Sequence, residues 1–261
     1  MASSLTELLE REEDSMSLAT NGKEAQGNHL LAALPREEFE RLRPNLQSVS
    51  LDLGKVIYES GEQMDYVYFP TTSHISLLYT MIDGSTAEMG LVGQEGIVGI
   101  ALFMGGETTP NRAMVQGGGE AFRMKSKAML DEFKRGGEFQ HLLLRYTQAL
   151  ITQISQTAVC NRLHSVEQRL CRWLLMTHDL AQTDELQMTH EFISNMLGVR
   201  REGVTLAAHR LQEMGMISYV RGHIHILDRQ KLLSHVCECY QVVKEEHNRL
   251  LGKHFASFLK R

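Results

Sequence analysis

The stretch that most constrains the fold is residues 189–211, which reads THEFISNMLGVRREGVTLAAHRL. Its apolar residues recur at helical spacing in two short runs, which predicts two helices joined by a tight turn. Gly198 stands between the runs, where a side chain is costly, and Ser194 is small enough to let two helices cross closely. Thr189 precedes the first run, where its hydroxyl can cap free backbone N–H groups. The residues expected to pack the two helices together are Phe192, Ile193, Met196, Leu197, Val204, Ala208 and Leu211.

The second predicted helix, residues 200–212, has a polar face opposite its apolar one. Arg201, Glu202, Thr205 and His209 fall on that face. This arrangement predicts a helix-turn-helix whose second helix enters the major groove of DNA. An ordinary helical hairpin at a domain edge is the alternative.

The residue types on this face suggest individual contacts. Arg201 is the first candidate for a base contact, because a guanidinium can bond O6 and N7 of guanine together. Glu202 is expected to accept from a cytosine amine or to orient Arg201, and Thr205 to touch a phosphate or a thymine methyl. The remaining candidates, expected at the DNA backbone, are Thr189, Arg200, His209, Arg210 and Arg221.

The segments around this stretch predict the rest of a DNA-binding domain, called the reader domain below. Residues 214–228 alternate apolar and polar side chains about Arg221 and Gly222, which predicts a β-hairpin with a tight turn, the wing of a winged helix. Arg221 and His223 at its tip either reach a phosphate or remain in solvent. Residues 186–188 predict a short strand, and Trp173 is expected to anchor the core of the helix at 164–178.

The first half of the chain has a different pattern. Between residues 46 and 124, short β-prone runs are separated by turn residues, which indicates an antiparallel roll, barrel or sandwich. A short helix is expected directly after Pro35. The turn residues are Gly54, Gly61, Pro70, Gly84, Gly90, Gly93, Gly96 and Gly99.

Two long helices are predicted beyond the β-rich part. Residues 139–163 carry apolar residues one, three or four positions apart, and residues 161–165 are expected to be a hinge. A further helix is expected from residue 232 to about 258, packed on the reader domain or extending a dimer interface. The periodic residues of the first helix are Leu142, Leu143, Tyr146, Ala149, Leu150, Ile154, Thr157 and Ala158.

Composition narrows the class of protein. The chain has 261 residues, enough for two modest domains, and a net charge of −5. That charge argues against coating nucleic acid through bulk attraction, but allows a specific binder with arginines gathered on one face. No apolar run approaches the roughly 18 residues of a membrane helix, and the acidic N-terminus lacks a signal pattern. We therefore predict a cytoplasmic protein with no membrane partner.

The sequence gives no reason to expect an enzyme or a metal protein. It contains no P-loop, HExxH or GxSxG motif. Its cysteines are Cys160, Cys171, Cys237 and Cys239, with no disulfide-framework spacing and none in the β-rich half for an iron–sulfur cluster. Because the pair Cys237 and Cys239 is short and isolated, we expect packing on a helix and predict no metal site.

Residues 54–70, GKVIYESGEQMDYVYFP, look like the first hairpins of the cyclic-nucleotide-binding β-roll. Together with the predicted helix-turn-helix, they resemble the Crp/Fnr family of bacterial transcription regulators over about residues 30–232. The resemblance implies an α+β fold with an N-terminal antiparallel, jelly-roll-like β-roll sensor, a long dimerisation helix and a C-terminal winged helix-turn-helix. It also implies a homodimer, with double-stranded DNA and RNA polymerase as partners.

We expect five segments. They are a flexible arm at residues 1–28 with a weak helix at 5–12, the sensor at 29–134, the dimerisation helix at 135–165, the winged helix-turn-helix at 166–232, and a C-terminal helix at 233–261.

The chain departs from the family pattern at two places. Cyclic-nucleotide-binding members carry Gly-Glu and, some residues later, an Arg before a small residue. Here Arg112 and Ala113 suit the arginine position, but Ile100 follows Gly99 where the glutamate should be. Isoleucine cannot accept a hydrogen bond, so a buried ribose hydroxyl would stay unpaired at a cost of about 1–3 kcal/mol. In the reader helix, Arg-Glu matches the family, but Leu206 stands where another arginine is frequent.

These departures set the expected ligands. We expect Arg112 to be a surface arginine or a structural ion pair, and the effector to be something other than cyclic AMP, or absent. No cofactor is predicted. His74 could be a haem ligand, but a structural role is the stronger interpretation of a single histidine in a strand. A regulator whose DNA binding requires a cyclic nucleotide is the alternative. Leu206 can meet a thymine methyl, so the target site is expected to differ from that of other members.

Overall fold

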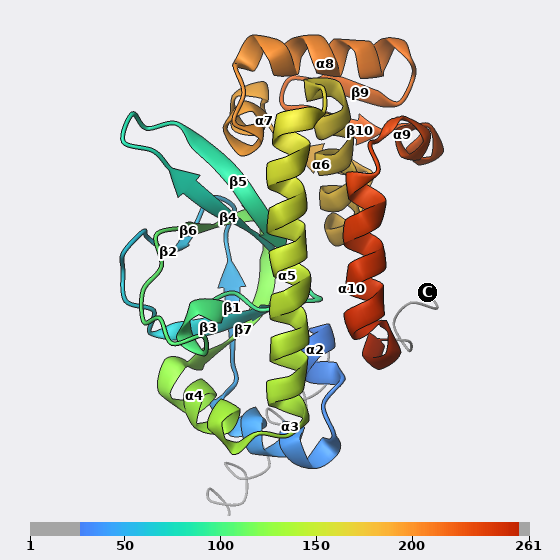
Figure 1. Ribbon diagram of the computed structural model, residues 1–261. Coiled ribbons are helices and arrows are strands. Elements are labelled where there is room, and N and C mark those ends of the chain that lie inside the picture. Colours follow the sequence, from blue (N-terminus) through green and yellow to red (C-terminus); the bar gives the residue numbers. More distant parts are fainter. Residues whose placement is uncertain (1–26, 256–261) are drawn as a thin grey trace, which may run out of the picture.

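The computed structural model describes residues 27–255. The predicted helix at residues 5–12, and the arm up to residue 26, lie outside the described residues. Two β-sheets lie on one side of a long helix, α5 (Glu138–Leu163), and a smaller helical unit lies at the far end of that helix (Figure 1). The chain is thus a β-rich sensor half and a helical reader half joined along one helix.

The sensor half contains two antiparallel sheets, as predicted. The three-stranded sheet has the order β1 (Gln47–Leu51), β7 (Gly119–Lys125), β3 (Tyr66–Pro70). The four-stranded sheet has the order β2 (Val56–Tyr58), β6 (Arg112–Gly117), β4 (His74–Thr80), β5 (Thr86–Val92). A core of buried side chains from both sheets includes Val67, Phe69, Ile75, Val115 and Phe122.

Asn28 corrects the predicted boundary of the arm. It is fully buried, and its side-chain oxygen accepts from the N–H groups of Leu30 and Leu31, which starts α2 (His29–Ala32). Its amide donates to the carbonyls of Pro70 and Gly96, each over 2.9 Å. Since four hydrogen bonds fix this residue, it belongs to the folded sensor and not to a flexible arm.

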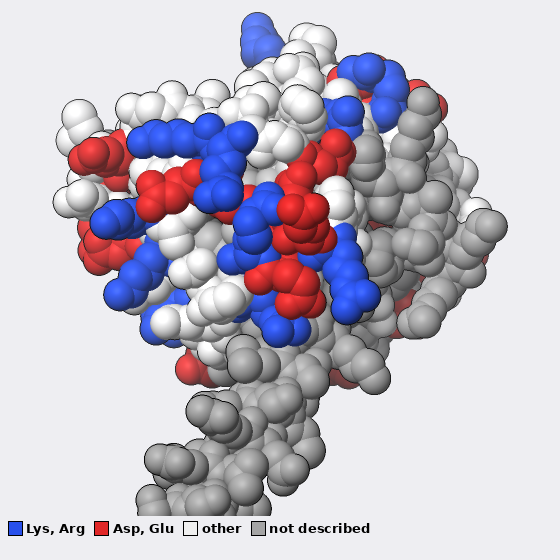
Figure 2. Space-filling model, turned by 90° about the horizontal axis from the view of Figure 1, so that it is seen from below, with Lys and Arg blue, Asp and Glu red and all other residues white. Residues whose placement is uncertain are grey.

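Short helices close the bottom of the sensor. They are α3 (Arg36–Leu42), which follows Pro35 as predicted, and α4 (Ser126–Arg135), with 3-10 turns η1 (Arg43–Asn45) and η2 (Ile100–Leu102) elsewhere in this half. Basic and acidic side chains are interspersed on this face (Figure 2), and several form ion pairs, such as Arg41 with Glu132 at 2.8 Å. The charges on this face are therefore largely compensated.

Helix α5 spans 26 residues and matches its predicted range closely. The apolar residues that predicted it mostly face the protein's own core. Leu142, Leu143, Tyr146 and Leu150 are all buried, and so is Thr157. That pattern therefore reports packing within the chain, and any partner would have to use the opposite face of the helix.

The reader half begins after a break at His164 and Ser165, inside the predicted hinge. Ser165 starts the next helix with a capping box to Gln168. The elements that follow are α6 (Val166–Ala181), β8 (Glu185–Gln187), α7 (His190–Leu197), α8 (Arg201–Glu213), β9 (Ile217–Val220), β10 (His223–Ile226) and α9 (Arg229–His235). The three strands form one antiparallel sheet, so the predicted wing is present.

The C-terminal segment differs from the single helix predicted from residue 232. It forms α9 and α10 (Cys239–Phe255), with a break at residues 236–238. Helix α10 packs along α5 (Figure 1); Tyr240 near its start joins the reader core and Leu251 near its end joins the sensor core. No helix in the described part of the chain is long and apolar enough to cross a membrane.

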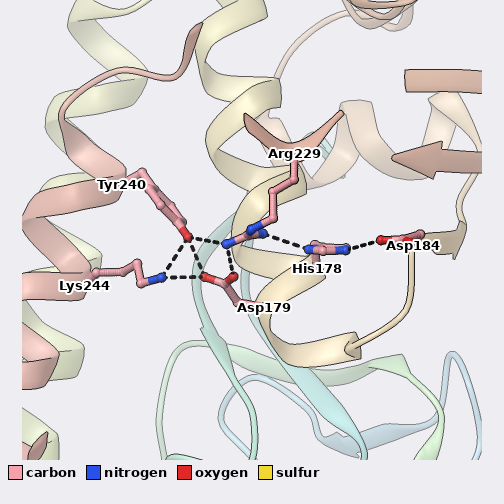
Figure 3. Close-up of polar contacts among 6 residues, drawn as sticks. All are labelled: His178, Asp179, Asp184, Arg229, Tyr240 and Lys244. Atoms are coloured by element: carbon pink, nitrogen blue, oxygen red, sulfur yellow. Dashed lines mark hydrogen bonds and ion pairs between the residues drawn. The ribbon is translucent and has the colours of Figure 1, made fainter. Parts of the chain in front are cut away.

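A polar network fastens α10 and α9 to the end of α6 (Figure 3). Arg229 donates to Asp179 over 2.5 Å and to His178 Nδ1 over 2.8 Å. Because a guanidinium can only donate, Nδ1 of His178 is the acceptor in this contact, and its Nε2–H donates to Asp184 over 2.8 Å. Tyr240 and Lys244 of α10 reach the same Asp179 carboxylate, at 2.7 and 3.6 Å. The start of α10 is thus held at a defined place on the reader half.

Candidate nucleic-acid interface

The helix-turn-helix is built as the sequence predicts. Thr189 is the N-cap of α7, and its hydroxyl oxygen accepts from the N–H of Phe192 over 3.1 Å. Gly198 ends α7 in the left-handed conformation, with φ +59°. Six of the seven predicted packing residues are buried, namely Ile193, Met196, Leu197, Val204, Ala208 and Leu211, and Phe192 packs at their edge.

The outer face of α8 gathers five of the predicted DNA contacts. A shallow hollow on it is lined by Arg201, Glu202, Thr205, Leu206 and His209, and all five side chains are exposed. Leu206 is 54% exposed, a large apolar side chain in a polar surface. The helix lies across the end of the molecule (Figure 1), where no other element of residues 27–255 covers this face.

Three arginines around this face carry positive charge that could contact DNA. Arg200, Arg201 and Arg221 are exposed, and in the part of the chain that the structure describes none of them forms an ion pair. The face at the opposite end mixes both signs of charge (Figure 2). Free guanidinium groups on a protruding helix and hairpin are the arrangement that phosphates and guanine edges require.

The hydroxyl of Thr205 is already engaged. It donates to the carbonyl of Arg201 over 3.1 Å and lies 3.0 Å from Nδ1 of His190, whose ring stacks on Tyr219 at 4.0 Å. Burial, together with the nearby Arg201 guanidinium, lowers the pKa of His190. Thr205 therefore links α8 to α7 and the wing. Its hydroxyl is occupied by these contacts, so only its methyl group can contact a DNA base. Sequence reasoning missed His190, because nothing in a one-dimensional pattern pairs it with Tyr219.

Two of the predicted backbone contacts face carboxylates instead. His209 lies 3.5 Å from Glu213 on the same helix, and Arg210 lies 3.5 Å from Glu167 of α6. Glu167 also contacts His235 of α9. Arg210 thus helps to hold α8 on the reader core. It is therefore a weaker candidate for contact with a DNA phosphate than Arg200 or Arg201.

The wing presents Arg221 at its tip. Arg221 and Gly222 have φ +49° and +86°, the two positive values that a type I′ hairpin turn requires. The neighbouring His223 is bonded to Glu185 over 2.9 Å. Of the two residues predicted at the tip, only Arg221 has no ion-pair partner within residues 27–255, so its guanidinium can contact a phosphate.

The residues predicted for the ligand pocket sit in the sensor, but as structural residues. Gly99 is buried with φ +107° and starts the turn η2, Ile100 packs on the apolar core, and Ala113 is fully buried. Nε of Arg112 lies 3.3 Å from a Glu59 carboxylate oxygen, so this arginine forms the structural ion pair that the sequence favours.

His74, the residue considered for haem, is a buried histidine against the sheet. Its ring lies over Gly117, where a Cβ would come within 1.8 Å of it. Burial lowers the pKa of His74 to about 4, so the ring is neutral at pH 7. The contact with Gly117 shows a residue packed for structure.

One cluster was missed entirely. The structure brings Cys160 and His164 to Cys237 and Cys239, with all four donor atoms within 4.8 Å of one another. In the sequence, Cys237 and Cys239 are the two of these residues that stand closest together. The available signal was the pair Cys160 and His164, four residues apart on a helix and therefore on one face.

Comparisons with known proteins find a matching domain family for each half of the chain. Residues 48–135 match the model of a cyclic nucleotide-binding domain, and residues 168–234 match that of a Crp-like helix-turn-helix domain. No curated protein matches the chain in sequence.

Solved structures share the fold at low sequence identity. One, described as a regulator of the crp/fnr family from Eubacterium rectale, has 17% identity and a TM-score of 0.64, over 81% of this chain and 97% of its own. FixK2 from Bradyrhizobium japonicum has 16% identity and a TM-score of 0.63, over 74% and 98%. The c-di-GMP responsive global regulator CLP from Xanthomonas campestris has 14% identity and a TM-score of 0.61, over 74% and 100%.

The two matched domains together cover more than half of the chain and follow each other in the order seen in the fold, with the helix-turn-helix exposed at the end of the reader half. The chain belongs to the Crp/Fnr family and is a DNA-binding transcription regulator.

Proposed function

We propose that this regulator reads a twofold-symmetric DNA site as a homodimer, with α8 in the major groove and the wing tip on the backbone. The observation that carries the proposal is the exposed outer face of α8, where Arg201 lies beside Glu202 and Leu206 and forms no ion pair with any residue that the structure describes. In this assignment Arg201 bonds a guanine, Glu202 accepts from a cytosine amine, and Leu206 meets a thymine methyl.

The outer face of α5 supports the dimer. Its exposed residues recur alternately three and four positions apart, which is the spacing of a coiled-coil seam. Leu144 and Ile151 on this line are 48% and 43% exposed. The seam consists of His141, Leu144, Gln148, Ile151, Ser155, Ala158 and Arg162. Pairing two copies there would bury the apolar members and present two α8 helices to half-sites about 34 Å apart.

We propose that the sensor half responds to an effector other than cyclic AMP, or that it binds no effector. Ile100 offers no acceptor to a ribose hydroxyl, and the Arg112 guanidinium is compensated by Glu59. A structure with this fold is described as c-di-GMP responsive, so the fold itself does not fix the ligand. The site of action would be the cytoplasm, where both DNA and RNA polymerase, the second proposed partner, are present.

Selection of bound DNA from a random pool tests the proposal. The purified full-length chain is expected to enrich one twofold-symmetric sequence whose half-sites are about 10 base pairs apart, centre to centre. The selection is repeated with cyclic AMP and with a metabolite extract. Failure to enrich any sequence under all three conditions would overturn specific DNA reading. Enrichment only with cyclic AMP would replace the proposal by the cyclic-nucleotide-dependent alternative.

A further inference from the structure

Four side chains of types that can bind a metal ion meet where α5 ends, α6 begins and α10 starts. Cys160 lies in the last turn of α5 and His164 is the residue that ends this helix. Cys237 lies in the break between α9 and α10, and Cys239 is the first residue of α10. Segments separated by more than 70 residues thus converge, and the three cysteines are buried.

The distances fit a single tetrahedral ion. Sγ of Cys160 lies 3.7 Å from Sγ of Cys237, and Sγ of Cys239 lies 3.4 Å from Nδ1 of His164. Two sulfurs bonded at about 2.3 Å to one tetrahedral zinc stand roughly 3.8 Å apart. The sulfur–sulfur distance is far too long for a disulfide, so the cluster is not a closed cystine. A cluster of several irons would spread its cysteines farther, since iron and sulfide atoms lie between them.

The surrounding groups orient the donors. Nε2 of His164 lies 3.3 Å from the carboxylate of Glu238, which fixes its ring with Nδ1 toward the cysteines. A carboxylate behind a histidine is the usual second contact of a zinc ligand. The amide of Gln156 donates to Sγ of Cys239 over 3.1 Å, a contact suited to a sulfur that carries negative charge.

The charge around the cluster also favours thiolates. Arg169 and Arg172 of α6 are buried, and among the described residues neither guanidinium forms an ion pair with a carboxylate. Both interact electrostatically with Cys160, and positive charge near a sulfur stabilises its thiolate form. Three thiolates, one neutral imidazole and a divalent cation carry one net negative charge, which the two guanidinium groups can offset.

We propose that Cys160, His164, Cys237 and Cys239 bind one structural zinc ion that fastens the start of α10 to the hinge end of α5. Three thiolates and an imidazole are a donor set that zinc prefers, and four protein donors leave no open position for a reaction. Because His164 is one of the two residues between α5 and α6, the ion would hold the junction from which the reader half extends. The proposal does not depend on which DNA sequence is read.

Metal analysis of the full-length protein is the direct test. The chain, purified without chelator, is expected to contain one zinc per chain and to lose it on treatment with a thiol-blocking mercurial. After the zinc is exchanged for Co²⁺, the visible absorption of tetrahedral, thiolate-bound cobalt should saturate at one equivalent. Removing the ion should lower the melting temperature, because binding to the folded state alone stabilises it.

Two variants and a matched control separate ligation from packing. Cys239→Ser and His164→Ala are each expected to lose most of the bound zinc. Cys171→Ala removes a cysteine that is equally buried but lies outside the cluster, in the reader core, and should keep one equivalent.

Three outcomes would overturn the proposal. The first is a wild-type protein that holds no zinc and gives no cobalt absorption, a result that does not require any variant to fold. The second is iron with inorganic sulfide in place of zinc. The third is full zinc content in both Cys239→Ser and His164→Ala.

Discussion

Glu88 is a carboxylate that the fold buries between its two halves. It lies on β5 and is 7% exposed; one oxygen accepts from the Ser76 hydroxyl over 2.6 Å and the other from the Trp173 indole N–H over 3.0 Å. Trp173 belongs to α6, so this contact joins the sensor sheet to the reader half. The lone tryptophan is a core anchor, as predicted, and it also carries a polar link that no sequence pattern could reveal.

A pH dependence of stability follows from Glu88. Burial raises the pKa of Glu88 from 4.5 to about 7 in the folded protein. Because the folded state binds the proton more tightly than the unfolded state, this contribution to stability is complete below pH 4.5 and is lost as pH rises through 7. Burial raises the pKa of Glu95 to about 7 as well, with the same sign.

Glu88→Gln tests this account, because the amide mimics the protonated carboxyl and can still accept from Trp173. Between pH 5 and 7.5, the wild type should lose about 2 kcal/mol more of its free energy of unfolding than the variant does. Denaturant unfolding at both pH values measures the difference. Glu107→Gln, a substitution of an exposed carboxylate, is the control and should follow the wild type. Parallel pH profiles for wild type and Glu88→Gln would show that Glu88 is already ionised in the fold.

At the scale of elements, α5 has two faces with separate roles. Its buried residues join the sensor core and contact α10, whereas the exposed line through Leu144 and Ile151 faces solvent in a single chain. The apolar members of this line, Leu144, Ile151 and Ala158, recur seven residues apart along a 26-residue helix and favour pairing with a second surface. The proposed dimer therefore depends on a line of residues that shares only Ala158 with those whose periodicity predicted the helix.

Ile151→Glu should break the dimer. Two glutamates would face each other across the twofold seam and replace an apolar contact, so a protein that sediments as a dimer should sediment as a monomer at micromolar concentration. Val242→Glu introduces the same charge at a similarly exposed apolar residue of α10 and should remain dimeric. Analytical ultracentrifugation decides the matter: an unchanged dimer for Ile151→Glu would place the interface elsewhere.

Elements that are determined by local sequence could be predicted, and features that depend on contacts between elements could not. Strong local signals predicted the helix-turn-helix, the wing and α5, because Gly198, the Arg221–Gly222 turn and a long breaker-free run each determine structure locally. The break before Cys239 was missed, because it depends on contacts of α10 with α5 and not on a proline or glycine. The contacts of Thr205 with His190 and of Arg210 with Glu167 could not be predicted for the same reason, because the partners come from other elements.

At the scale of the whole molecule, the sensor touches the reader directly. Besides Glu88 and Trp173, the Thr86 hydroxyl lies 3.4 Å from the carbonyl of Asn195 in α7, and Ala87 packs against Gly198 in the turn before α8. The strand β5 thus leads from the sensor core to the helix-turn-helix. Any ligand that shifts β5 has a short path to the reading helix.

In the proposed complex, α8 reads bases through Arg201 in each half of a symmetric site. Binding of wild type and Arg201→Ala should be compared on the selected site and on all its single-base variants, at one salt concentration. Arg201→Ala is expected to weaken binding by about 1–3 kcal/mol and to lose discrimination at one base pair in each half-site. Equal weakening on every sequence, with the wild-type preference retained at all positions, would contradict direct reading by this arginine.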